Sequence, residues 1–225
     1  MTPLAWLALA AITFVGSHLL LSHPLRGPLA ARLGEKGFMA VYVPVALVTF
    51  GLMWLAASRT PPELPLWVAG DGLWAVATLL MWLGSILFVG SFRRNPALPR
   101  PGGPPTEIAP PTGVFRITRH PMNWGFAIWG IVHIAVIADP SGMIIGAAIL
   151  VLALVGSAGQ DSKKRRQIGA AWEEWVRRTS FVPFGRGLAW PGAFAFVGGT
   201  LFFLLATWLH QRMAPMPAGI WRWIG

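Results

Sequence analysis

The sequence predicts an all-α fold: a polytopic membrane helical bundle of about six transmembrane helices. Hydrophobic residues make up 55% of the chain and charged residues only 12%, whereas a soluble domain would expose many more Lys, Glu and Asp side chains. The apolar runs are continuous and do not alternate, which favours helices over the strands of a barrel. The chain has no cysteine, which excludes disulfides, thiolate-bound zinc, iron–sulfur clusters and thiol nucleophiles.

Six apolar runs carry this prediction, since a helix needs about 20 residues to cross the hydrocarbon core. They cover about residues 4–22, 39–57, 72–91, 122–138, 141–159 and 190–209, and the fourth is short. The first run has no basic segment before it and is followed by basic residues, so we expect a retained helix and not a cleaved signal peptide. We expect residues 1–225 to form a single transmembrane domain, with no internal repeat and no soluble module.

Basic residues are distributed unevenly between the two predicted membrane faces. Fifteen of the eighteen follow the first, third and fifth runs, and the other three are Arg59, Arg212 and Arg222. The positive-inside rule therefore predicts three cytoplasmic loops and both termini outside, in a multi-pass protein of the bacterial inner membrane. Topology and contact with membrane lipids explain the net charge of +10, so we expect no nucleic-acid partner.

Two connections have a distinctive composition. Residues 95–111 hold seven prolines and two glycines, which is typical of a stiff surface loop, here between the third and fourth runs. Residues from about 163 to 178 predict an amphipathic helix in which Trp172, Trp175 and Val176 share one face. We expect this helix to lie in the headgroup region of the membrane.

Two histidines, His18 and His133, lie inside apolar runs. A titratable side chain at membrane depth costs several kcal/mol unless a partner satisfies it, and neutral imidazole is a common ligand of haem iron and other metals. Both are therefore candidate catalytic and metal-ligating residues. His18 is the best partner for His133, because it is the only other histidine well inside a run. We expect His23 and His210 at the membrane interface.

A basic cluster of Arg116, Arg119 and His120 precedes the fourth run. Such a cluster at a helix N-terminus either binds a carboxylate or phosphate of a cofactor or anchors the helix at the cytoplasmic surface. His120 is thirteen residues from His133, which is about 20 Å along a helix, so the two cannot share a metal. Asp161 follows the fifth run, and we expect it to pair with Arg119 or Arg116.

Small residues precede each of the two histidines inside the apolar runs. Gly16 and Ser17 lie in the first run, and Gly125 and Gly130 lie in the fourth. Small residues allow either another helix or a flat ring to approach closely. Helix packing and room for a cofactor therefore remain alternative explanations.

Several segments together resemble the NnrU family of membrane proteins, which includes the plant and cyanobacterial 15-cis-zeta-carotene isomerases. The segments are the first run and residues 33–42, 113–133, 160–166 and 172–184. The resemblance implies a helical membrane bundle and, in the isomerase members, haem b held by two histidines. These correspond here to His133 and His18, with His23 as the alternative second ligand.

The resemblance also implies a function. It points to a redox-dependent isomerase of a carotenoid-like, lipid-soluble polyene, with an electron donor that the sequence does not identify. The bacterial members of the family are linked to nitrogen-oxide respiration (denitrification), so an accessory role there is the other function it implies. A third possibility is a non-catalytic membrane assembly factor, in which the histidines only pack.

A more distant resemblance, to the isoprenylcysteine carboxyl and phospholipid methyltransferases, rests on residues 113–121. It implies an S-adenosylmethionine-dependent methyltransferase of a lipid-soluble substrate as an alternative function. The chain departs from that pattern in two places. The expected Tyr after the His-Pro pair is replaced by residues 122–124, and the expected paired acids are replaced by Gln160 and Asp161.

Overall fold

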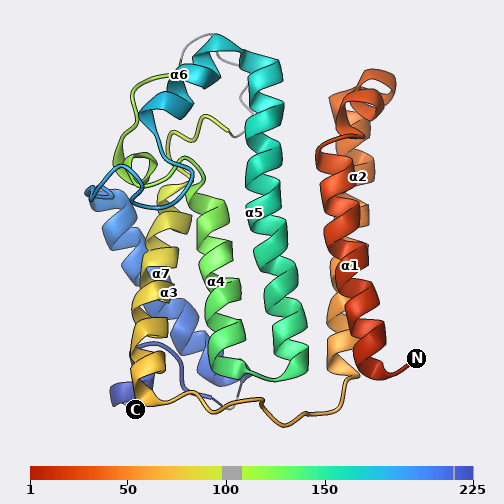
Figure 1. The fold of residues 1–225 in the computed structure, drawn as a ribbon, viewed down its shortest axis with the longest axis vertical. Coiled ribbons are helices and arrows are strands. Elements are labelled where there is room, and N and C mark those ends of the chain that lie inside the picture. The colour runs from red at the N-terminus through yellow and green to blue at the C-terminus, as the bar shows by residue number, and fades with distance from the viewer. Residues whose placement is uncertain (98–107, 215, 225) are drawn as a thin grey trace.

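The computed structural model describes residues 1–97, 108–214 and 216–224, and this part of the chain is helical with no strand (Figure 1). The elements in order are α1 (Pro3–Ser22), α2 (Arg26–Ser58), α3 (Asp71–Gly90), the short helix η1 (Gly113–Arg116), α4 (Pro121–Ile137), α5 (Pro140–Ile168), α6 (Ala170–Arg178), α7 (Ala193–Met213) and α8 (Trp221–Ile224). The predicted all-α bundle is confirmed. The proline-rich loop predicted over residues 95–111 lies mostly outside the described residues.

Six helices correspond to the six predicted spans. Among the described residues, α1, α2, α3, α5 and α7 are long and apolar enough to cross a membrane, and α4 is a shorter apolar helix. Its 17 residues match the short fourth run and lie at the lower end of the range for a span. The chain is therefore a multi-pass membrane protein whose lipid-facing side chains contact membrane lipids.

Two helices extend further than the apolar runs predict. α2 begins at Arg26, and it contains a kink at Gly34, where φ is 70°, a conformation that glycine adopts at little cost. α5 has 29 residues, about 43 Å of helix, which is longer than a hydrocarbon core of about 30 Å. The predicted start of a separate helix at about residue 163 is therefore wrong. α5 continues to Ile168, and the positive φ of 59° at Gly169 ends it before α6.

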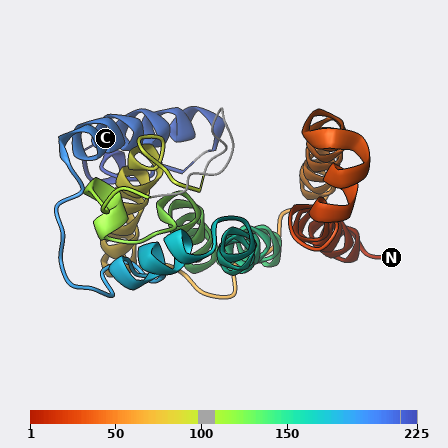
Figure 2. The same cartoon turned by 90° about the horizontal axis from the view of Figure 1, so that it is seen from above.

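α5 lies between two groups of helices (Figures 1 and 2). On one side it packs against α1, which also packs against α2, so that α1 and α2 form a hairpin at the edge of the bundle. On the other side it packs against α4, which packs against α3, and α3 packs against α7. Any cofactor that bridged α1 and α4 would therefore have to reach past α5.

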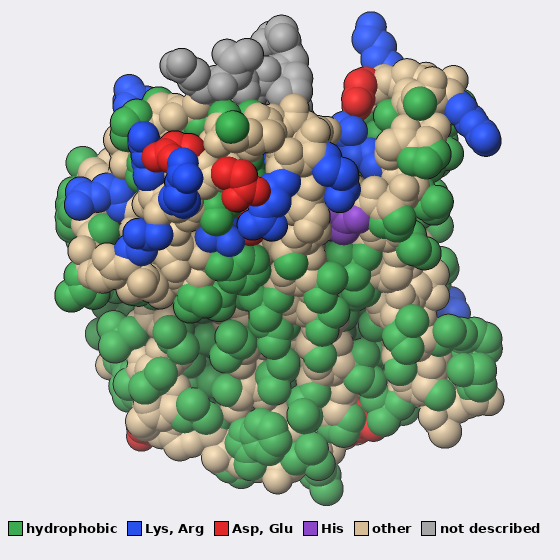
Figure 3. Space-filling view, turned by 45° about the horizontal axis from the view of Figure 1, so that its top comes forward, with side chains coloured by type: hydrophobic (Ala, Val, Ile, Leu, Met, Phe, Trp, Pro, Cys, Tyr) green, Lys and Arg blue, Asp and Glu red, His purple; other side chains and the backbone are tan. Residues whose placement is uncertain are grey.

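The two ends of the bundle differ in charge. Both termini lie at the end opposite α6, as the predicted topology requires (Figure 1). Lys and Arg side chains gather at the end that contains α6 and the connection between α1 and α2, and hydrophobic side chains cover the flank below it (Figure 3). We call this second end the basic end.

The aromatic face of α6 packs inside the protein. Trp172 is fully buried and Trp175 is 4% exposed, and both belong to the main hydrophobic core together with Val114 and Phe115. The location of this helix in the headgroup region stays a prediction, but its aromatic face contacts protein. The amphipathic pattern correctly indicates a buried face, but η1 and the core of the bundle cover that face in place of lipid.

Glycines allow close helix contacts at some of the predicted positions. A Cβ on Gly130 would lie 2.6 Å from the carbonyl oxygen of Gly146, and a Cβ on Gly125 would lie 2.9 Å from that of Gly84. These glycines therefore serve helix packing, between α4 and α5 and between α4 and α3. Gly16 has no neighbour within 4 Å, so no close contact explains it.

Candidate functional site

His133 lies in α4, and its contacts leave one ring nitrogen free to bind a metal. Its ring stacks on Trp129, with 3.8 Å between the ring centroids and 24° between the planes. Its Nδ1 lies 2.8 Å from the carbonyl oxygen of Trp129. A carbonyl oxygen only accepts, so Nδ1 carries the proton and Nε2 keeps a free lone pair. Metal-ligating histidines have this arrangement, in which a backbone carbonyl fixes the tautomer and the ring orientation.

His210, near the C-terminal end of α7, is a further candidate partner for His133 that the sequence analysis did not consider. Both histidines lie toward the C-terminal ends of their helices, which are on the predicted outer side. Nδ1 of His210 is buried and has no hydrogen-bond partner in the part of the chain that the structure describes. The predicted topology places His210 on the same side as the end of the fourth run, because the fourth and sixth runs both end on the outer side.

His18 faces α2 and not α4. Its ring lies 4.8 Å from that of Phe14 and 5.4 Å from that of Tyr42, between centroids. Its Nδ1 is buried without a hydrogen-bond partner among the described residues. Because α5 separates α1 from α4 (Figure 2), this arrangement does not bring His18 and His133 together. One haem could join them only if the hairpin of α1 and α2 moved.

His23 follows α1 and packs against α5. Its imidazole lies so close to Gly159 that a Cβ there would collide with the ring. Burial is the main cause that lowers the pKa of His23, and the positive charges of Lys163 and Arg166 lower it further. The predicted interfacial position agrees with this location at the basic end, although one face of the ring is covered by α5.

Arg119, His120 and Asp161 form a buried ionic cluster where α4 begins. Arg119 donates from Nε and Nη2 to Oδ2 of Asp161, at 2.9 and 2.7 Å. Nε2 of His120 lies 3.0 Å from Oδ1 of the same carboxylate, and its Nδ1 lies 3.2 Å from Oε1 of Gln160. His120 is 3% exposed and Asp161 4%. The imidazole therefore lies between the carboxylate of Asp161 and the side-chain amide of Gln160.

This cluster confirms the predicted pairing of Asp161 with Arg119, whereas Arg116 is exposed on η1 and takes no part in it. The backbone N–H of Arg119 also donates to the carbonyl oxygen of Ser180 at 2.8 Å. The guanidinium of Arg119 and the ring of His120 are thus engaged within the protein. The structure does not gather these two side chains and Arg116 into one open site for a cofactor.

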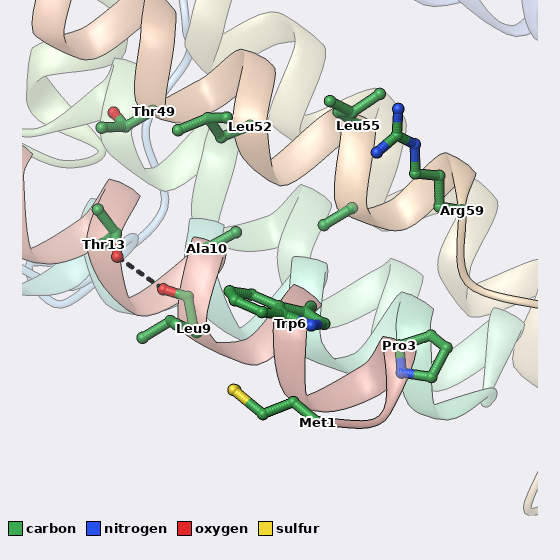
Figure 4. Close-up of a pocket in the computed structure, with 11 residues that line it drawn as sticks. Met1, Pro3, Trp6, Leu9, Ala10, Thr13, Thr49, Leu52, Leu55 and Arg59 are labelled. Atoms are coloured by element: carbon green, nitrogen blue, oxygen red, sulfur yellow. Dashed lines mark hydrogen bonds between the residues drawn. The ribbon is translucent and has the colours of Figure 1, made fainter.

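An apolar groove of about 470 Å³ runs between α1 and α2 (Figure 4). Trp6 and Leu9 of α1 and Leu52 and Leu55 of α2 line its walls, and Arg59 lies at one end. Apolar walls with few polar groups are typical of sites for lipid-soluble ligands. Its other end reaches Thr49, whose hydroxyl lies 3.4 Å from that of Ser17, the residue before His18.

A comparison with known protein families decides the identity of the chain. The family model described as NnrU protein matches residues 6–218. The chain belongs to the NnrU protein family. This confirms the family that the sequence segments indicate, and the match includes all six predicted spans except the first residues of the first.

Two curated relatives resemble part of this NnrU protein. The chloroplastic 15-cis-zeta-carotene isomerase of Zea mays is 33% identical over 73 residues, which are 32% of this chain and 20% of the relative. The enzyme of the same name from Arabidopsis thaliana is 30% identical over 73 residues, with the same coverage. The matched region thus spans about a fifth of these relatives. No solved structure matches the NnrU protein significantly.

Proposed function

We propose that this NnrU protein is a membrane-embedded isomerase of a lipid-soluble polyene, that it uses haem b, and that it acts in the bacterial inner membrane. The family and the curated relatives named as 15-cis-zeta-carotene isomerases support an isomerase-like role in a membrane. The observation that carries the proposal is the hydrogen bond from His133 to the Trp129 carbonyl. It leaves an imidazole lone pair free at membrane depth, where an unused polar atom is costly.

The hydrogen bond from Nδ1 leaves Nε2 of His133 free, and we propose that His133 would hold the haem iron. Three histidines are candidates for the second ligand of the haem iron. His210 lies near the end of α7, on the same predicted side as His133, His18 requires movement of the hairpin, and His23 lies at the basic end. When bound, haem would supply a redox-active iron that can withdraw electron density from a conjugated double bond and so ease rotation about it.

The other residues of the site would bind the substrate and orient His133. The groove between α1 and α2 is large enough, at about 470 Å³, to hold part of a hydrocarbon chain away from water. Trp129 holds the His133 ring through both the stacking contact and the backbone hydrogen bond. The buried ionic cluster fixes the first turn of α4 against α5, and it thereby sets the position of the helix that carries His133.

Conversion of a cis-polyene by the reconstituted protein tests this proposal. We expect haem-loaded protein in liposomes to convert 15-cis-zeta-carotene to a trans isomer after chemical reduction, as measured by chromatography. His133→Ala should slow the conversion by at least about 100-fold, because loss of a metal ligand exceeds the 10–100-fold effect of losing an outer partner. The matched control is Ile131→Ala, an exposed residue on the same helix, which should retain the rate.

Two results would contradict the isomerase assignment. One is an unchanged rate in folded His133→Ala protein. The other is no conversion by the loaded protein. Transfer of a tritiated methyl group from S-adenosylmethionine to a lipid-soluble acceptor would then indicate the methyltransferase. No conversion and no methyl transfer would leave the assembly factor or the nitrogen-oxide accessory role as the function of the chain.

A further inference from the structure

A second cavity, of about 530 Å³, lies at the basic end, at the interface between the α1–α2 hairpin and α5. The connection over residues 23–28 forms one wall, and Lys163, Arg166 and Gln167 of α5 form the other. We call this cavity the basic pocket. It is separate from the apolar groove and from His133, and of its lining residues only His23 is also a candidate for the second haem ligand.

Positive charge in the basic pocket exceeds negative charge. Arg26 pairs with Glu35 at 2.9 Å. No carboxylate among the described residues lies within ion-pair distance of Lys163 or Arg166. Three cations therefore converge on one cavity with one carboxylate nearby. These positive charges repel one another, and a bound anion would reduce that repulsion.

His23 provides a second observation at the same place. Its Nδ1 is buried and has no hydrogen-bond partner in the described part of the chain, although the ring lines the basic pocket. A buried polar nitrogen without a partner costs free energy. The ring lies beside the cations of the pocket, and an anion there would offer acceptor oxygens to Arg26 and Arg166.

We propose that the basic pocket binds a phosphate group, carried either by the headgroup of a membrane phospholipid or by soluble phosphate. Guanidinium groups bind phosphate through paired hydrogen bonds, and a lysine adds a point charge. Basic pockets between transmembrane helices on the cytoplasmic side are known to bind anionic headgroups. The pocket lies at the basic end, where the long α5 leaves the predicted membrane.

The bound phosphate has a structural consequence. Arg26 belongs to the hairpin, whereas Lys163 and Arg166 belong to α5, and α1 makes the main packing contact between the hairpin and the rest of the bundle. One phosphate would therefore join the two units and neutralise the repulsion between them. Binding should stabilise the folded protein by an amount that rises with the logarithm of ligand concentration above the Kd.

Thermal unfolding of delipidated protein in a neutral detergent tests this site. Saturating dioctanoyl phosphatidylglycerol should raise Tm by at least about 4 °C, and dioctanoylglycerol, which lacks the phosphate, should not. Inorganic phosphate is compared with chloride at equal ionic strength. A shift with the phospholipid alone assigns the site to a lipid headgroup, and a shift with both assigns it to phosphate from either source. No shift with either overturns the proposal.

A pair of variants separates the pocket from general attraction of anions. Lys163→Gln/Arg166→Gln should lose the shift. Arg32→Gln/Lys36→Gln should keep it, since these exposed residues lie at the same end but do not line the pocket. If the first pair fails to fold, the single Arg166→Gln change, at an exposed residue, should still reduce the shift. Equal loss in the Arg32/Lys36 control, or an unchanged shift in Arg166→Gln, overturns the proposal.

Discussion

Asp161→Ala is expected to destabilise the protein by about 3–5 kcal/mol, because it leaves the buried guanidinium of Arg119 without its counter-charge. The carboxylate accepts two hydrogen bonds from Arg119 and lies 3.0 Å from His120. The side chains of Arg119 and Asp161 are only 10% and 6% exposed. Truncation of one partner in such a cluster costs far more than loss of a surface ion pair.

Thermal unfolding in detergent, followed by circular dichroism, measures this effect. The expected loss corresponds to a fall in Tm of roughly 6–20 °C for a chain of this size. Glu174→Ala is the matched control, because Glu174 also pairs with two arginines, Arg177 and Arg178, but these pairs are on the surface of α6. The control should unfold close to the unmutated protein. Equal Tm values for the two variants would contradict the importance of the buried cluster.

Gly130→Ala is expected to destabilise the contact between α4 and α5 by about 1–3 kcal/mol, the usual effect of overpacking. The added Cβ would lie 2.6 Å from the carbonyl oxygen of Gly146 and 3.1 Å from the Cβ of Leu150. The backbone of Gly146 cannot turn aside as a long side chain can. The helices must therefore move apart, and His133, three residues along α4, should move with them.

Gly156→Ala is the matched control for that change. Gly156 lies on α5, like Gly146, but has no neighbour within 4 Å of the position of a Cβ. Replacement of an unconstrained helical glycine by alanine stabilises by about 0.4–1 kcal/mol. Tm should fall for Gly130→Ala and stay or rise for Gly156→Ala. A higher Tm for Gly130→Ala than for Gly156→Ala would contradict the close approach of α4 and α5.

The sequence predicts the spans well because the length of an apolar run reflects the thickness of the bilayer. It does not predict where helices end beyond the membrane. There, α5 continues through a basic segment until Gly169, and α2 begins well before its apolar run. It also shows that the face of Trp172 and Trp175 is apolar, but an amphipathic pattern does not say whether lipid or protein covers that face.

The candidate site was partly predictable for the same reason. The pairing of Arg119 with Asp161 follows from the predicted topology, since both residues lie at the cytoplasmic ends of their apolar runs. The relation of His18 to His133 depends on the lateral order of helices, and no sequence pattern shows that α5 lies between α1 and α4. The distance between His210 and His133 likewise depends on that lateral order.

The absorption spectrum of the purified, haem-reconstituted protein tests the central claim most directly. Neutral imidazole is a strong ligand of haem iron, so the unmutated protein should show a Soret band and His133→Ala should lose most of it, whereas Ile131→Ala keeps it. If the unmutated spectrum is low-spin, whichever of His18→Ala, His23→Ala or His210→Ala turns it high-spin identifies the second ligand. A full low-spin spectrum in folded His133→Ala protein would contradict the account.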